Sequence, residues 1–141
     1  MVAPPRGQQR RVAVAAAILP VAETGNATSG TAATPIANVR SNDTVNGAAA
    51  TSANSTIATS GSWPAGITLN TTTGAISTTA AVQPGTYSLV YQLCDLNTPA
   101  NCQTVTDTIT VAAAILPVAD SGTATSGTPS TPVANVRAND T

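Results

Sequence analysis

The stretch TYSLVYQLC, residues 86–94, and the stretch CQTVTDTITV, residues 102–111, set the fold class of this chain. Every second residue of the first stretch is large and apolar or aromatic, namely Tyr87, Leu89, Tyr91 and Leu93. The second stretch alternates in the same way, with Val105, Ile109 and Val111 opposed to threonines. This period of two is typical of half-buried β-strands and predicts an antiparallel hairpin. Asp107 shares the parity of the apolar residues, which predicts either an exposed strand end or a β-bulge.

Further strands are expected on both sides of this hairpin. Gly, Pro, Asn and Asp recur every 8 to 12 residues or so, which is typical of all-β sandwiches. The turn residues Asn70 and Gly74 bracket a second hairpin, and Asn46-Gly47 supplies another turn. The predicted strands cover residues 18–28, 35–41, 49–60, 66–70, 74–79, 86–94 and 102–113.

The composition limits both the core and the partners. The 141 residues suffice for one domain and part of another, with no Phe, one Trp and two Tyr. We therefore expect a core of small aliphatic residues. A net charge of −1 gives no basic surface for nucleic acid, and we predict no nucleic-acid partner. No apolar run approaches the roughly 18 residues of a membrane span, so no membrane insertion is expected.

An internal repeat organises the chain. Residues 12–44 and 109–141 align without a gap at an offset of 97 residues, and most positions are identical. VAVAAAILPVA, residues 12–22, could be the apolar part of a secretory signal, but a signal has no reason to recur after a complete domain. We predict an N-terminal arm or linker at 1–11, a complete module at 12–108 and the start of a second, truncated module at 109–141. Pro20 and Pro117 are expected at the module joints.

Residues 62–95, SWPAGITLNTTTGAISTTAAVQPGTYSLVYQLCD, resemble the immunoglobulin-like repeat of bacterial surface proteins. PVANVRAND and VADSGTATSG are similar to the front half of tandem immunoglobulin-like or cadherin-like repeats. The resemblance implies an immunoglobulin-like β-sandwich with Greek-key connections, repeated along secreted or cell-surface bacterial proteins. The aromatic content is lower than is usual in that family.

Cys94 and Cys102 lie at the end and the start of the two strands of the predicted hairpin. A disulfide between them is favoured over two free thiols, and it would indicate export to an oxidising compartment. A metal site at these cysteines is weaker still, because the chain has no other Cys and no His to complete one.

Acidic residues near the joints raise the question of calcium. The resemblance to cadherin-like repeats makes Glu23, Asp43, Asp120 and Asp140 candidate ligands. Calcium usually takes 6 to 8 oxygen ligands, including several carboxylates, and each joint offers few. The alternative, which we favour, is that these side chains cap turns. For Arg40 and Arg137, a salt bridge at a strand end is favoured over ligand capture.

The sequence lacks the residues that most catalytic sites need. There is no His and no Lys, so the many Ser and Thr hydroxyls have no usual base to activate them. We predict a non-enzymatic structural repeat of a secreted or cell-surface stalk, fibre or adhesin, whose partners are neighbouring copies. Residues 109–141 could pair with, or swap into, a neighbouring chain. The alternative is an adhesive module that recognises a glycan or a host protein through its loops, with Trp63 as the aromatic platform.

Overall fold

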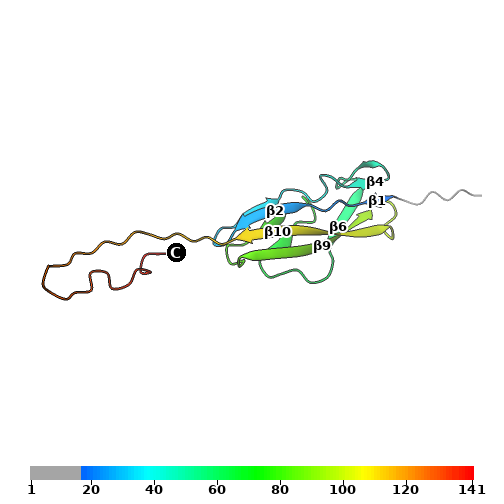
Figure 1. Ribbon diagram of the computed structural model, residues 1–141. Coiled ribbons are helices and arrows are strands. Elements are labelled where there is room, and N and C mark those ends of the chain that lie inside the picture. The colour runs from blue at the N-terminus through cyan, green and yellow to red at the C-terminus, as the bar shows by residue number, and fades with distance from the viewer. Residues whose placement is uncertain (1–16) are drawn as a thin grey trace, which may run out of the picture.

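The computed structural model describes residues 17–141, and within this range the chain forms β-strands and no helix (Figure 1). The strands are β1 (Ile18–Leu19), β2 (Thr24–Thr28), β3 (Ala33–Ile36), β4 (Thr44–Val45), β5 (Ala48–Ala49), β6 (Ser55–Thr59), β7 (Ile67–Leu69), β8 (Ile76–Thr78), β9 (Gly85–Asp95) and β10 (Cys102–Ala112). The part of the chain that the structure describes holds no helix long and apolar enough to cross a membrane.

The strands form two main sheets and a small third one. The four-stranded sheet has the order β2-β10-β9-β6, and the three-stranded sheet has the order β3-β8-β7. The small sheet, β1-β4-β5, lies at the end of the module where β1 begins (Figure 1). The chain crosses between the two main sheets four times: between β2 and β3, between β3 and β6, between β6 and β7, and between β8 and β9. This is the predicted immunoglobulin-like sandwich with Greek-key connections.

The predicted hairpin is confirmed, and its strands β9 and β10 lie in the middle of the four-stranded sheet. Its register runs without interruption from the pair Cys94 and Cys102 to the pair Gly85 and Val111. Asp107 lies opposite Leu89 in this continuous ladder, and its side chain is fully buried. Both expectations for Asp107 are therefore wrong, since it lies neither at an exposed strand end nor at a bulge.

Five of the predicted strands are shorter or divided, and two of them, 66–70 and 74–79, are only trimmed to β7 and β8. The segment 18–28 is split, because β1 pairs with β4 in the small sheet whereas β2 pairs with β10 in parallel. The segment 35–41 ends as a strand at Ile36, and Asn38 then turns the chain by accepting a hydrogen bond from the Arg40 amide. The segment 49–60 is interrupted by a turn in which the Asn54 side chain accepts a hydrogen bond from the Thr51 amide.

Both predicted turns are confirmed. Asn46 and Gly47 have φ angles of 54° and 79°, the left-handed values that a two-residue type I′ hairpin requires. At the β7–β8 hairpin the Asn70 amide donates to the Ala75 carbonyl, and the Gly74 amide donates to the Asn70 carbonyl.

The core consists of small aliphatic side chains with one buried tyrosine, as the composition predicts. The buried apolar residues are Ile18, Ala27, Ile36, Val39, Val45, Ala50, Ile57, Ile67, Ile76, Val82, Leu89, Tyr91, Leu93, Ile109 and Val111. Tyr87, near the start of β9, donates its hydroxyl to the Gln83 carbonyl, 2.7 Å away. This contact is a tyrosine corner, a feature of Greek-key sandwiches.

The chain beyond β10 leaves the sandwich. β10 continues to Ala112, four residues past the boundary that the repeat alone suggests. Residues 113–141 form no strand and are almost entirely exposed. They extend away from the end of the module opposite to β1 (Figure 1). The first strand and the exit from the last strand therefore lie at opposite ends of the sandwich.

Candidate functional site

Two buried carboxylates hold the connector between β1 and β2. The Val21 amide donates to Oδ1 of Asp43 at 2.7 Å, and the Glu23 amide donates to Oδ1 of Asp107 at 2.8 Å. Pro20 has no amide hydrogen, and the chain changes sheets here, so these two amides have no strand partner. An amide left without a partner in a protein interior is costly, and the two carboxylates remove that cost.

Asp43 is joined to the core through Tyr91. The Tyr91 hydroxyl lies 2.7 Å from Oδ2 of Asp43 and 3.1 Å from the Val39 carbonyl oxygen, and both side chains are buried. Burial raises the pKa of Asp43 above its ordinary value, although the Tyr91 hydroxyl, the Val21 amide and the Arg40 charge each act against this. Burial, followed by the hydrogen bond to Asp43, raises the pKa of Tyr91 as well, so the hydroxyl stays protonated and donates.

Asp107 lies in the core and in the continuous ladder of β9 and β10, where the sequence did not predict it. Its Oδ2 is buried without a hydrogen-bond partner, as is Oε2 of Glu23. Its pKa is raised to about 6: burial and, to a smaller extent, the charges of Glu23 and Asp43 raise it, and the hydrogen bond from the Glu23 amide lowers it. The only signal in the sequence was its parity, which places it on the core face of β10 with Ile109 and Val111.

Among the described residues 17–141, Arg40 forms no strand-end salt bridge of the kind that the sequence suggested. It is 4% exposed, and its guanidinium donates to the backbone oxygens of Thr71 and Thr72, at 3.1 and 3.3 Å. Burial lowers its pKa, and the Asp43 charge opposes this. Arg40 therefore ties the loop after β3 to the β7–β8 turn.

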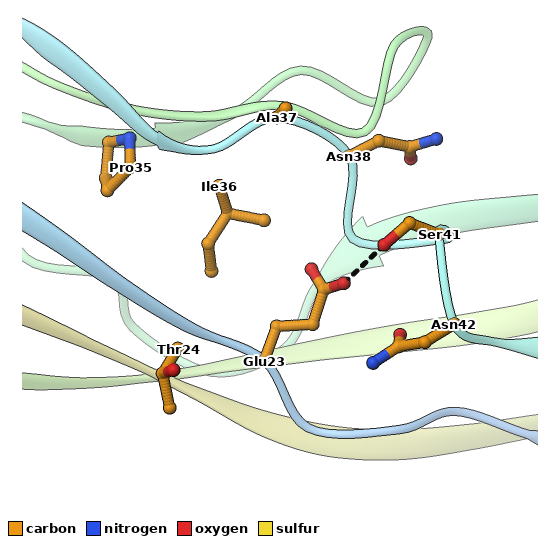
Figure 2. Close-up of a pocket in the computed structure, with 8 residues that line it drawn as sticks. All are labelled: Glu23, Thr24, Pro35, Ile36, Ala37, Asn38, Ser41 and Asn42. Atoms are coloured by element: carbon orange, nitrogen blue, oxygen red, sulfur yellow. Dashed lines mark hydrogen bonds between the residues drawn. The ribbon is translucent and has the colours of Figure 1, made fainter.

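A hollow of about 430 Å³ lies beside the connector (Figure 2). It is lined by Glu23, Thr24, Pro35, Ile36, Ala37, Asn38, Ser41 and Asn42. Figure 2 shows the Glu23 carboxylate directed at Ser41, whose hydroxyl donates to it at 2.6 Å. Glu23 is the only carboxylate in this lining, and Asp43 and Asp107 are not part of it.

Three of the four calcium candidates make hydrogen bonds within the protein, and the fourth is exposed. Within residues 17–141 no group of three or more His, Cys, Asp or Glu side chains is placed to hold a metal ion. Of the four calcium candidates, Glu23 and Asp43 bind a serine hydroxyl, a tyrosine hydroxyl and an amide. Asp140 accepts a hydrogen bond from the Val118 amide at 2.8 Å, and Asp120 is exposed. Asp43 and Asp140 each accept a hydrogen bond from a backbone amide 22 residues earlier in the chain.

The buried polar groups beside the connector between β1 and β2 stabilise the fold. Asp43, Tyr91 and Asp107 are buried. Asp43 and Asp107 accept hydrogen bonds from backbone amides, and Asp43 also accepts one from the Tyr91 hydroxyl. None of the three lines the hollow beside Glu23.

Cys94 and Cys102 form a disulfide with an S–S distance of 2.00 Å, as the sequence favoured. The bond closes the end of the β9–β10 hairpin. Next to it, Oδ2 of Asp95 accepts a hydrogen bond from the Asn46 side chain at 3.0 Å, and Oδ1 accepts one from the Asn97 amide at 2.8 Å. This end of the hairpin is therefore linked to the small sheet.

The two prolines of the repeat lie in different surroundings. Pro20 directly follows β1, where the chain crosses from the small sheet to the four-stranded sheet. Pro117 lies in the exposed segment that follows β10. One strand of the described module thus precedes Pro20.

The second copy of the repeat keeps the local contacts of the first. Asp140 and Val118 reproduce the bond between Asp43 and Val21, and the Asn135 side chain accepts from the Arg137 amide as Asn38 does from Arg40. A Cβ added at Gly25 would lie 2.6 Å from the Pro35 oxygen, and one at Gly122 would likewise meet the Pro132 oxygen. Both copies therefore share these contacts, although only the first copy forms strands.

Trp63, the platform of the alternative binding hypothesis, packs against the core. Its indole N–H donates to the Val90 carbonyl at 2.8 Å, and the side chain is half-buried.

The comparison with family models agrees with this architecture. The family model described as "Putative Ig domain" matches residues 15–112. No curated protein matches the sequence. Among solved structures, the chain is similar to Drosophila N-cadherin EC1-3, with 14% identity and a TM-score of 0.44. That match covers 66% of this chain and 32% of the cadherin chain, so this chain spans about a third of the cadherin's length. The match over residues 15–112 places the chain in the putative immunoglobulin domain family.

Proposed function

We propose that this chain is a non-enzymatic structural module of a secreted or cell-surface bacterial stalk, fibre or adhesin, repeated head to tail. The observation that carries the proposal is the second copy at residues 113–141. It leaves the module at the end opposite to β1 and has the local contacts of the segment that begins the first module (Figure 1).

The module is suited to a passive, extended role. The first strand and the exit lie at opposite ends, so successive sandwiches would lie in line and touch only their neighbours, as in other repeat arrays. Pro117 would stiffen the joint, because its ring fixes one backbone angle. The Cys94–Cys102 disulfide supports an oxidising location outside the cytoplasm.

A lengthened chain tests this proposal. Residues 45–112 are appended again after Thr141, so that the second copy of the repeat is followed by the rest of a module. We expect two folded sandwiches and a maximum dimension in small-angle X-ray scattering about twice that of one module. The matched control is the same chain with Val136→Asp, which should retain one sandwich. A globular particle, or an appended segment that stays unfolded, would contradict the proposed head-to-tail array.

The alternative of a binding module remains a prediction from the sequence. The Trp63 indole uses its N–H within the module, which gives this alternative no support. A glycan array in which Trp63→Ala removes a signal would favour it over the array.

A further inference from the structure

The sandwich is closed along one side and open along the other. On the closed side β2 contacts β3, and a Cβ added at Gly25 would meet the Pro35 backbone. On the open side lie the two remaining edge strands, β6 of the four-stranded sheet and β7 of the three-stranded sheet. Within the described chain β6 pairs only with β9, so its outer edge is unpaired.

The register of β6 shows which backbone groups this edge offers. The Ser60 amide donates to the Val90 carbonyl on the β9 side. Residues that bond to the neighbouring strand alternate along an antiparallel ladder, so Ala58 faces β9 as well. Ile57 and Thr59 lie between these positions, and their N–H and C=O groups are directed away from β9. These groups are available to an added strand.

A hollow of about 330 Å³ lies against this edge. Thr56 and Ile57 of β6 line it on one side, and Thr71 and Thr72 of the β7–β8 turn line it on the other, together with Arg40. Among the described residues no acidic side chain belongs to this lining. The hollow thus joins the unpaired strand edge to a single positive charge.

The module does not neutralise the charge of Arg40 by direct contact. The guanidinium is buried and donates to the backbone oxygens of Thr71 and Thr72, which carry no net charge. Its Nε is also buried, and within residues 17–141 it has no hydrogen-bond partner. Burial lowers the pKa of Arg40, although the Asp43 charge raises it. A buried cation without a hydrogen-bonded anion is costly, and a carboxylate brought into the hollow would reduce that cost.

We propose that an extended peptide segment of a partner protein adds to the outer edge of β6 and places an acidic side chain in the hollow beside Arg40. Residues directly opposite each other on neighbouring strands have their side chains on the same face. Because Ile57 and Arg40 line the same hollow, the acidic residue is the one opposite Ile57, and its two neighbours point to solvent. The site lies on an edge strand and does not depend on the proposed array.

The two halves of the site have different tasks. The backbone groups of Ile57 and Thr59 pair with any extended peptide, as in other cases of strand addition. Arg40 supplies the specificity, because an arginine side chain has five N–H donors in a planar fork and only two of them donate to Thr71 and Thr72. A sugar acid would offer the same carboxylate, but it has no row of N–H and C=O groups to pair with β6.

The test uses the full chain and the peptide TVTETVT, blocked at both ends, whose glutamate and valines lie on one face of an extended strand. The matched peptide TVTQTVT lacks only the charge. Binding is followed by NMR titration of the backbone amides. The signals of Ile57 and Thr59 should shift most within β6, because their N–H groups gain acceptors. The glutamate peptide should bind at least about tenfold more tightly than the glutamine peptide.

Two pairs of variants assign the contacts. Arg40→Gln and Arg137→Gln each remove one positive charge, but Arg137 is exposed in the segment after β10. Only Arg40→Gln should abolish the preference for the glutamate peptide. Thr59→Pro removes an N–H that makes no bond to β9, so the ladder is kept while peptide binding falls at least about tenfold. Thr59→Ser keeps this N–H and should bind as the unsubstituted chain does.

The unfolding midpoint shows whether each variant is folded, and the Thr59 pair and the two peptides decide the question even if Arg40→Gln does not fold. Equal affinity for the two peptides, or unchanged Ile57 and Thr59 signals, would overturn the proposal. So would equal peptide binding by Thr59→Pro and Thr59→Ser. Sodium glucuronate should bind at least about tenfold more weakly than TVTETVT. Equal or tighter binding of glucuronate would replace the peptide by an acidic glycan and overturn the proposal as well.

Discussion

The Glu23 amide donates a hydrogen bond to Oδ1 of Asp107, although 84 residues separate the two in the sequence. This bond joins the start of β2 to the middle of β10, beside the point where the chain changes sheets. The second carboxylate oxygen of Asp107 is buried without a hydrogen-bond partner. The carboxylate therefore lies in the core with only one of its two oxygens hydrogen-bonded.

The stability of the module should depend on pH through Asp107. Its pKa is about 6 in the folded protein against an ordinary 3.8, so the folded state binds the proton more tightly. The stability contributed by the neutral form is complete below pH 3.8 and is lost as the pH rises through 6. Between pH 7 and pH 5 the free energy of unfolding should rise by about 1 kcal/mol relative to Asp107→Asn.

Urea unfolding of both proteins at pH 5, 6 and 7 measures this difference. Asp43, whose pKa is also raised, and the neighbouring Glu23 and Tyr91 are present in both proteins, so the comparison isolates Asp107. Parallel pH profiles for the two proteins would refute the assignment.

Tyr91→Phe should destabilise the module by about 1–3 kcal/mol, because it leaves the buried Asp43 carboxylate without one of its donors. Tyr87→Phe is the matched control. It also removes a tyrosine hydroxyl bond, but to the Gln83 carbonyl at an exposed position, and should cost less. Thermal unfolding at neutral pH checks both, and equal losses would show that burial of the Tyr91 hydroxyl is unimportant.

Loss of the disulfide should weaken the module without changing its fold. Cys94 and Cys102 are eight residues apart, and a loop of this size is worth about 2.5 kcal/mol in the chain-entropy account. The measurement is the unfolding midpoint of the double Cys→Ser variant beside that of the oxidised protein. Circular dichroism should be unchanged, since the hairpin keeps its ladder of backbone hydrogen bonds.

Gly25→Ala should destabilise the module by about 1–3 kcal/mol, because the added Cβ would lie 2.6 Å from the Pro35 oxygen and force β2 away from β3. Gly122→Ala offers a control at the equivalent position of the second copy. It should leave the unfolding of the first module unaltered, since residues 113–141 lie outside the sandwich. A shared loss of stability would mean that the exposed segment contributes to the module after all.

The local features of this chain were predictable from its residues. The alternation in residues 86–94 and 102–111 identified the central hairpin, because side chains in a strand point alternately to the two faces of a sheet. Asn46-Gly47 identified a turn for the equally local reason that its backbone angles suit those residues. Cys94 and Cys102 followed from the hairpin, since its register brings them opposite each other.

The partners of the charged groups were decided by the tertiary structure alone. The division of residues 18–28 between two sheets leaves the Val21 and Glu23 amides without strand partners, and only the folded chain shows that Asp43 and Asp107 are there to accept them. Arg40 likewise finds its carbonyl acceptors on a turn more than 30 residues away. The sequence determines periodicity and turns because these depend on neighbouring residues. Burial of a charge depends on which distant segments pack around it, and that was settled only when the two sheets came together.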